Sequence, residues 1–287
     1  MTEKLKVLDL FSGIGGFSLG LERTGGFETV AFCEIEDFPR KVLAKHWPDV
    51  PCYEDVKKLK GSDVGAVDVI CGGFPCQDIS TAGRQEGIEG KRSGLWSECV
   101  RLLRDVRPKY GVFENVTNLL NGEGGAWFKR VLWDISQIGY DAIWHCIPAS
   151  ELGAHHHRDR VWIVVYPNET PSKGRSISSR IHKELANAYG RSDDWCARHN
   201  VADPVSWRQS RQGEFEQSIY PEAVADWEAA KPVNGCIGQI WQAEPGVGRV
   251  VDGVWKKSYG HRLGALGNAV VPQIPEIIGR AILESET

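Results

Sequence analysis

Short apolar runs alternate with helical patterns through residues 1–165, and this alternation restricts the possible folds more than any other feature of the sequence. Apolar runs bounded by glycine or proline predict buried strands. They lie at 6–11, 29–33, 67–71, 110–113, 142–147 and 160–165. Helices are expected between them at 16–22, 37–46, 95–106 and 128–138. This order predicts an α/β fold with a parallel sheet covered by helices on both faces.

The pattern changes after residue 166, where periodicity weakens and tryptophan, arginine, glycine and proline dominate. We therefore expect a main domain at 1–167, a small domain of irregular or short-stranded structure at 168–257, and a C-terminal segment at 258–287. The entry to the small domain, 168–179, is expected to be flexible. A last apolar helix is expected at 274–283, packed back on the sheet.

The composition is that of an ordinary globular protein, with 41% apolar and 25% charged residues. No apolar run reaches the roughly 18 residues needed to span a membrane, and the N-terminal pattern is not typical of a signal peptide. We therefore expect a cytoplasmic protein without a membrane span. The net charge of −4 argues against non-specific coating of nucleic acid but allows a local basic surface.

The eight cysteines form no C-x-x-C pair, so the sequence indicates neither a zinc ribbon nor a thioredoxin-like motif. Free thiols are expected in a chain of this size without a secretion signal. Cys76 follows a buried strand in Gly72-Gly73-Phe74-Pro75-Cys76, at a point where the chain must turn. Nearby backbone N–H groups or cations could stabilise a thiolate there. A buried structural cysteine is the alternative that this pattern leaves open.

A glycine turn, Gly13-Ile14-Gly15-Gly16, joins the first strand to the first helix and would let a ligand approach the backbone closely. The dinucleotide pattern G-x-G-x-x-G fails because Ser18 occupies its third glycine position. Glu34 ends the next strand, where a carboxylate suits ribose hydroxyls. These features indicate a nucleotide-like cofactor, although a tight structural connection would give the same pattern.

Charged residues also stand near the later strands. Glu114 ends a strand, where burial would raise its pKa and make it a proton donor to a ring nitrogen; a solvated loop acid is the alternative. Arg158 and Arg160 share one face at strand spacing, and could hold a carboxylate, a phosphate or a base edge, or form a solvated edge. The neighbouring histidines at 155–157 alternate faces and lack a partner pattern, so we expect no metal site.

Six elements, in order, resemble the DNA cytosine-5 methyltransferase family of bacterial or phage type. They are Asp9-Leu10-Phe11-Ser12-Gly13-Ile14-Gly15-Gly16, Glu34, Gly72-Gly73-Phe74-Pro75-Cys76-Gln77, Glu114-Asn115-Val116, Arg158-x-Arg160 and Gly267-Asn268-Ala269-Val270-Val271-Pro272. The resemblance covers about 5–166 and 258–287. It implies a Rossmann-like class I methyltransferase domain with a mostly parallel twisted sheet, and a small target-recognition domain at 168–257.

The resemblance implies transfer of a methyl group from S-adenosylmethionine to carbon 5 of cytosine in DNA. The Cys76 thiolate would add to carbon 6 of the base, while Glu114 would hydrogen-bond or protonate ring N3. Arg160 would hold the base and orient Glu114, with Arg158 beside it. Because a cytosine inside a duplex cannot present carbon 6 to a thiol, the base must be flipped out.

The resemblance also implies which residues bind S-adenosylmethionine and DNA. Glu34 would bind the ribose hydroxyls, Ile35 would pack on adenine and Asp55 would lie near the adenine amino group. The other cofactor contacts would come from Phe11, Gly13, Gly15, Gly16, Val56, Pro75, Leu95, Asn268 and Val270. The loop from Gln77 to Gly94 would close over DNA through Ser80, Arg84, Lys91 and Arg92.

Two departures from the family pattern stand out. His156 replaces the usual glutamine, and the arginine-rich element expected before Gly267 is absent, which blurs the second boundary of the target-recognition domain. We expect a monomer that acts on double-stranded DNA without a metal. A tRNA-directed enzyme with the same chemistry and a catalytically silent DNA-binding regulator are the alternatives. The long insert at 168–257 favours DNA, and the intact Cys76 and Glu114 argue against a silent protein.

Overall fold

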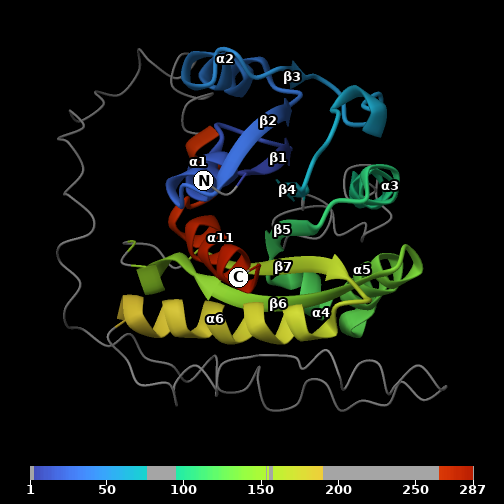
Figure 1. Ribbon diagram of the computed structural model, residues 1–287, viewed down its shortest axis with the longest axis vertical. Helices are drawn as coiled ribbons and strands as arrows, with labels where there is room; N and C mark the ends of the chain where they lie inside the picture. The colour runs from blue at the N-terminus through green and yellow to red at the C-terminus, as the bar shows by residue number, and fades with distance from the viewer. Residues whose placement is uncertain (1–2, 76–94, 153, 155–157, 190–264, 287) are drawn as a thin grey trace.

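The computed structural model describes residues 3–75, 95–152, 154, 158–189 and 265–286, which contain a seven-stranded sheet (Figure 1). The strand order in the sheet is β3-β2-β1-β4-β5-β7-β6. The strands are β1 (Leu5–Leu10), β2 (Phe27–Cys33), β3 (Cys52–Tyr53), β4 (Val69–Gly73), β5 (Tyr110–Val116), β6 (Tyr140–Pro148) and β7 (Asp159–Pro167). The six strands expected from the sequence are present, and β3 is an addition.

The sheet is parallel from β3 to β5, and β7 enters it antiparallel between β5 and β6. The expected mostly parallel α/β fold is confirmed. The exception follows from chain length: only residues 149–158 separate β6 from β7, too few for the crossover that a parallel pair requires. The two strands therefore pair as a hairpin, and β7 brings its first residues to the end of β5.

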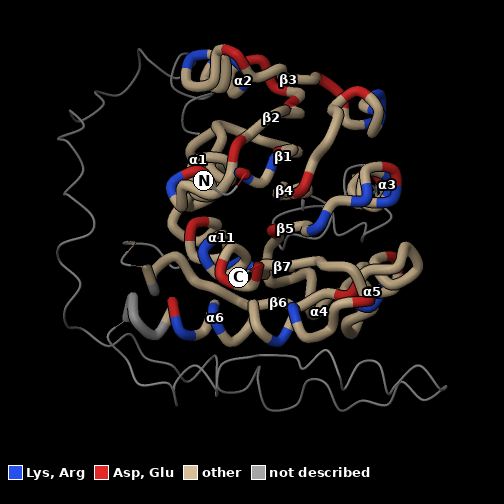
Figure 2. Tube along the Cα trace, in the orientation of Figure 1, with Lys and Arg blue, Asp and Glu red and all other residues tan. Residues whose placement is uncertain are grey.

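Helices cover both faces of this sheet. The α-helices of the described residues are α1 (Gly16–Arg23), α2 (Asp37–His46), α3 (Trp96–Val106), α4 (Asn118–Asn121), α5 (Ala126–Gln137), α6 (Pro171–Tyr189) and α11 (Gln273–Ser285). Short 3-10 turns are η1 (Gly61–Asp63), η3 (Gly122–Gly125) and η4 (Ala149–Leu152). Figure 2 shows charged residues of both signs spread over the outer helices α2, α3 and α6.

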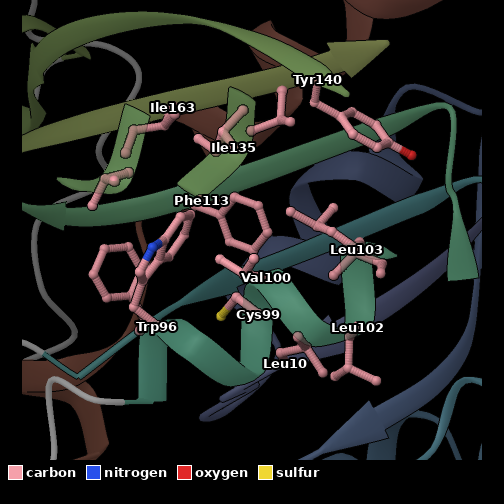
Figure 3. Packing of buried hydrophobic residues seen from close by; sticks show 14 of the residues in the cluster. Leu10, Trp96, Cys99, Val100, Leu102, Leu103, Phe113, Ile135, Tyr140 and Ile163 are labelled. Atoms are coloured by element: carbon pink, nitrogen blue, oxygen red, sulfur yellow. The ribbon is translucent and has the colours of Figure 1, made fainter. Parts of the chain in front are cut away.

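Two hydrophobic clusters lie on the two faces of the sheet, because successive side chains of a strand point in opposite directions. In β7, Val161, Ile163 and Val165 belong to one cluster, whereas Trp162 and Val164 belong to the other. The first cluster includes α3 and α5, and Figure 3 shows Trp96, Cys99 and Leu103 of α3 packed toward Phe113 and Ile163 of the sheet. The second includes α1, α6 and α11.

Residues 171–189 differ from the expectation of a flexible, irregular entry at 168–179. They form α6, whose Ile177, Ile181 and Leu185 recur every fourth residue and are buried against the sheet. Position 174 of this helix requires glycine, because a Cβ there would lie 2.1 Å from the Tyr166 hydroxyl oxygen. The helix therefore packs on the main domain, and the rest of the expected small domain, 190–257, lies outside the described residues.

The last helix returns to the sheet as expected. α11 packs against α1 and α6, and its side chains Ile274, Ile278 and Ile282 are buried. The C-terminal segment is thereby packed against the first helix of the chain. A Cβ at Gly20 of α1 would lie 2.2 Å from the Pro272 carbonyl oxygen, so glycine permits this close approach. Within the described residues, no helix is long and apolar enough to cross a membrane.

Candidate active site

The turn after β1 uses backbone conformations that favour glycine. Phe11 leaves the strand at a φ of 51°, and Gly13 and Gly15 follow at 53° and 86°. A Cβ at Gly15 would lie 2.7 Å from the Trp47 ring, whereas a Cβ at Gly13 would meet no atom within 4 Å. The turn is therefore packed from behind at Gly15 and open at Gly13, as a backbone that receives a ligand must be.

Glu34 is a buried carboxylate just beyond β2, with 8% of its surface exposed. Its Oε2 accepts a hydrogen bond from the Gly13 N–H at 2.8 Å, and its Oε1 accepts one from the Glu36 N–H at 2.7 Å. Each carboxylate oxygen has a further lone pair for a hydroxyl donor. Ile35 beside it is 75% exposed, an unusual position for a large apolar residue. An apolar surface next to a pair of acceptors fits the base and ribose of a nucleoside.

The chain after β3 makes a tight turn that begins at Asp55. Its Oδ1 accepts a hydrogen bond from the Lys57 N–H at 3.0 Å, and its carbonyl accepts one from the Leu59 N–H at 3.1 Å. Val56 is buried in the hydrophobic cluster that includes α3, and the partly buried Leu95 packs against the same cluster. The predicted cofactor contacts Val56 and Leu95 thus share one hydrophobic cluster, and Asp55 directly precedes Val56.

The C-terminal segment closes over the glycine turn. A Cβ at Gly16 would lie 2.6 Å from the Val270 carbonyl oxygen. Arg158 holds the same segment, because its Nη1 and Nη2 donate to the carbonyls of Gly267 at 2.6 Å and Ala269 at 2.7 Å. Asn268 lies between these two anchors and is exposed.

Arg158 and Arg160, which could share one strand face by their spacing, contact different partners in the structure. Arg158 precedes β7 and has a φ of 42°, so strand alternation does not set its direction. Its guanidinium contacts the C-terminal segment, whereas Arg160, at the start of β7, contacts Glu114.

Glu114 and Arg160 form an ion pair near the carboxyl end of β5. Glu114 Oε1 lies 2.8 Å from Arg160 Nε, and the side chains are 13% and 23% exposed. Burial raises the pKa of Glu114, while the charges of Arg160 and Arg158 oppose the rise. Gly73 is paired with Glu114 in the sheet, and a Cβ there would lie 3.0 Å from Glu114 Oε2. Glycine therefore leaves room beside the carboxyl oxygen that Arg160 does not hold.

Asn115 fixes the chain that leads to Cys76. Its Nδ2 donates to the Phe74 carbonyl at 3.1 Å, and its side chain is 1% exposed. Phe74 also packs on Trp96, with ring centroids 5.0 Å apart. Sequence reasoning used Asn115 only as part of a motif and gave it no role. The sequence feature that could have indicated a role for Asn115 is an amide side chain near the end of an apolar strand.

Asp9 is a second residue that sequence reasoning left without a role. Its side chain has no exposed surface, and Oδ2 accepts hydrogen bonds from the Ser18 hydroxyl at 2.8 Å and the Ser18 N–H at 3.4 Å. These bonds join β1 to α1 beneath the glycine turn. Burial raises the pKa of Asp9 to about 7. Its signal in the sequence was a single acid inside an apolar run.

The described cysteines are free thiols in poor positions for nucleophilic chemistry. They are Cys33, Cys52, Cys71, Cys99 and Cys146. Burial raises the pKa of each, to about 12 for Cys33 and Cys146, so their thiolates are disfavoured. Cys76 directly follows Pro75, the last residue of the described range 3–75.

Several predicted residues lie outside the described parts of the chain. These are Cys76, the DNA-loop residues Ser80, Arg84, Lys91 and Arg92, and the histidines at 155–157. Within the described ranges, no group of three or more histidine, cysteine, aspartate or glutamate side chains is arranged to hold a metal ion.

The strand order, the open glycine turn and the buried acid after β2 define a Rossmann-like class I methyltransferase fold. The model of the C-5 cytosine-specific DNA methylase family matches residues 5–227. The chain therefore belongs to this family, whose chemistry requires a methyl-donor cofactor.

Two named relatives show how far the similarity extends. Type II methyltransferase M1.ScrFI of Lactococcus lactis subsp. cremoris is 34% identical over 171 residues, which are 60% of this chain and 44% of that protein. Type II methyltransferase M2.BsuMI of Bacillus subtilis (strain 168) is 34% identical over 184 residues, 63% of this chain and 46% of that protein. The chain thus matches about half the length of these relatives.

A solved structure gives the same assignment of the fold. It is that of a prophage-encoded E. coli protein assigned as a DNA modification methyltransferase, with 27% sequence identity and a TM-score of 0.50. The alignment covers 58% of this chain and 47% of that chain.

Proposed function

We propose that this protein is a DNA cytosine-5 methyltransferase that transfers a methyl group from S-adenosylmethionine to cytosine through the Cys76 thiolate. The observation that carries the proposal is the partly buried Glu114–Arg160 pair beside Gly73, two residues before the Pro75-Cys76 step. An acid with a raised pKa on β5, and a cysteine that follows the neighbouring strand β4 in the sequence, are the two groups that this chemistry needs.

The cofactor site of the proposal lies over the glycine turn. Glu34 would accept the ribose hydroxyls, Ile35 would pack on the adenine ring, and Asp55 would accept from the adenine amino group. The open space at Gly13 and the exposed Ile35 support a nucleoside in this place. S-adenosylmethionine, when bound, supplies a methyl group on a positively charged sulfur. Further contacts would come from Phe11, Gly15, Gly16, Val56, Pro75, Leu95, Asn268 and Val270.

Cys76 begins the proposed reaction by forming a bond from its sulfur to carbon 6 of the cytosine. Glu114 donates a hydrogen bond or proton to ring N3, so negative charge does not build up on the base during addition. Carbon 5 then carries the electron pair that would form the bond to the methyl carbon, while the methyl–sulfur bond of the cofactor would break and leave its electron pair on a neutral thioether. Loss of the proton from carbon 5 and breakage of the sulfur–carbon bond restore the aromatic ring and free Cys76.

Arg160 orients Glu114 in this scheme. Its Nε contacts Oε1 of Glu114. The other oxygen, Oε2, would then face ring N3. We assign Arg158 a positioning role, because its guanidinium is committed to the carbonyls of Gly267 and Ala269. Its positive charge nevertheless opposes the rise in the Glu114 pKa.

The proposed substrate is double-stranded DNA with the target cytosine flipped out of the stack. The loop residues Ser80, Arg84, Lys91 and Arg92 would contact DNA, and residues 190–257 would recognise the target sequence. The basic and aromatic residues of that segment suit contacts with phosphates and base edges. We propose a monomer that acts without a metal ion.

The test is a methyl-transfer assay with labelled S-adenosylmethionine and unmethylated genomic DNA, followed by mass spectrometry of the digested nucleosides. We expect 5-methyldeoxycytidine with the wild type and none with Cys76→Ser, which should still bind the cofactor. Cys71→Ser is the matched control, because that thiol is buried. Label on an exocyclic amine, or on tRNA in place of DNA, would overturn the proposal.

A further inference from the structure

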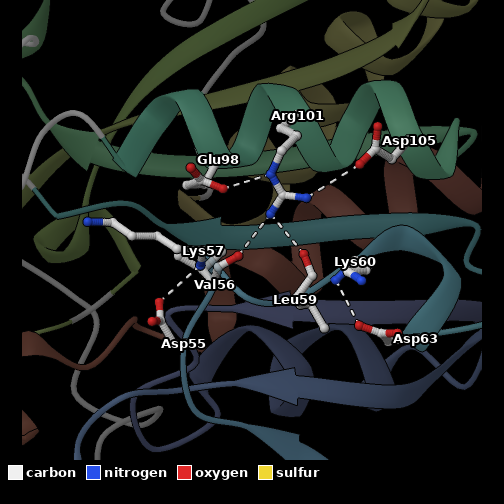
Figure 4. Close-up of polar contacts among 9 residues, drawn as sticks. All are labelled: Asp55, Val56, Lys57, Leu59, Lys60, Asp63, Glu98, Arg101 and Asp105. Atoms are coloured by element: carbon white, nitrogen blue, oxygen red, sulfur yellow. Dashed lines mark hydrogen bonds and ion pairs between the residues drawn. The ribbon is translucent and has the colours of Figure 1, made fainter.

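Arg101 of α3 clasps the turn that begins at Asp55. Its Nη2 donates hydrogen bonds to the carbonyls of Val56 at 2.9 Å and Leu59 at 2.8 Å (Figure 4). These carbonyls are 45 and 42 residues away in sequence, so the contact is long-range. One nitrogen of Arg101 thus links helix α3 to the turn that follows β3.

Two acidic residues of the same helix form ion pairs with the Arg101 guanidinium and orient it toward this turn. Arg101 Nε lies 2.7 Å from Glu98 Oε2 and Nη1 lies 3.4 Å from Asp105 Oδ2, while the Arg101 side chain is 31% exposed. Ion pairs within a helix surface contribute little stability by themselves. Here they hold the planar guanidinium of Arg101 in one orientation. The single ammonium group of a lysine cannot make the same set of contacts.

Each of the two linked segments carries or adjoins residues of the proposed cofactor site. Asp55 and Val56 form the turn, and Leu95 immediately precedes α3, which begins at Trp96. Arg101 lies five residues further along that helix. Since α3 is rigid over this length, a bond from Arg101 to the turn fixes the separation between Leu95 and Asp55.

We propose that Arg101 is a positioning residue for the adenine side of the cofactor site, an inference that rests on the function proposed above. It touches neither the base nor the reacting atoms. By holding the Val56 and Leu59 carbonyls, it keeps the Asp55 carboxylate where an adenine amino group can reach it.

The test compares the 287-residue wild type with Arg101→Met, Arg101→Lys and the control Arg104→Met. Arg104 is an exposed residue of the same helix. S-adenosylmethionine binding is measured by calorimetry, and folding by thermal unfolding. Methyl-transfer kinetics give kcat and the KM values for S-adenosylmethionine and for DNA. We expect both Arg101 variants to raise the Kd and KM for S-adenosylmethionine about tenfold, as when a ligand forfeits roughly one hydrogen bond. The KM for DNA should stay within about twofold, and Arg104→Met should match the wild type.

The outcomes separate this inference from the function on which it rests. A folded Arg101→Lys variant with wild-type cofactor affinity would overturn the inference alone. An equal loss of affinity for DNA and cofactor would do the same, because it would indicate a general structural role. A wild type that binds no S-adenosylmethionine would overturn the proposed function, and this inference with it.

Discussion

Asp9 shows how a single buried group can make folding depend on pH. Burial raises its pKa from 3.8 to about 7, although two hydrogen bonds from Ser18 partly oppose the rise. The folded state therefore holds this proton more tightly than the unfolded state does. Its contribution to stability is fully present below the unfolded pKa of 3.8 and is lost as the pH rises through about 7.

Asp9→Asn should remove this dependence, since asparagine keeps an acceptor for Ser18 but does not ionise. The advantage of the variant over the wild type in free energy of unfolding should grow by on the order of 3 kcal/mol between about pH 4.5 and about pH 7.5. Urea unfolding at both pH values measures it, and the exposed Asp49→Asn is the control. Parallel wild-type and Asp9→Asn curves would contradict the account.

Glu114 carries the acid chemistry of the proposed reaction. Glu114→Gln should lower kcat by roughly 10²–10⁴-fold, the usual contribution of a positioned general acid. Binding of S-adenosylmethionine should be unchanged, because Glu34 and not Glu114 approaches the glycine turn. The exposed Glu123→Gln is the control. A Glu114→Gln enzyme with a kcat near that of the wild type would remove Glu114 from the mechanism.

At the scale of elements, one arginine ties the C-terminal segment to the start of β7, and two close approaches bring the segment against α1. Arg158 bonds the carbonyls of Gly267 and Ala269, and glycines at 16 and 20 let Val270 and Pro272 lie against α1. The proposed cofactor pocket is therefore completed by residues from the opposite end of the chain.

Arg158→Ala should loosen this segment by removing two charge-assisted hydrogen bonds, worth about 2 kcal/mol together at a partly exposed site. We expect faster amide hydrogen exchange over 267–272 and weaker S-adenosylmethionine binding. Arg175→Ala, an exposed position on α6, is the control. If Arg158→Ala slows methyl transfer while exchange and cofactor binding stay normal, Arg158 acts on the base and not on the segment.

The elements also show what a sequence can and cannot predict here. Apolar runs between turn residues located every strand except the two-residue β3, which is too short to show a period. α6 was missed because its apolar stripe is narrow and many of its other positions are serine, lysine or arginine, which resemble a loop. The short connection makes β7 antiparallel to β6, but its position between β5 and β6 depends on pairing with a distant strand, which local patterns do not encode.

The candidate site was predicted in the same uneven way. Motifs identified Glu34 and Glu114, because acids at strand ends stand out against apolar runs. They could not show that Arg158 bonds the C-terminal segment, or that Arg101 reaches the turn at Asp55, since both contacts join residues far apart in sequence. Long-range hydrogen bonds to backbone carbonyls leave no spacing pattern to detect.

At the scale of the whole molecule, the described residues form one sheet with β1 in it, and the C-terminal helix packs against helices that cover it. β1 lies near its centre, and α11 packs on α1 and α6. A single fold therefore brings together Glu34, Glu114 and the chain leading to Cys76 along one edge. This convergence is what the proposed chemistry requires.

Bisulfite sequencing of DNA from a host without cytosine methylation tests the central claim most directly. The host would express this protein or its Cys76→Ser variant at equal, soluble levels. The account predicts 5-methylcytosine confined to one short sequence motif with the wild type and none with the variant. Unmethylated DNA from a host that holds soluble, cofactor-binding protein would contradict it and favour an RNA substrate or a silent regulator.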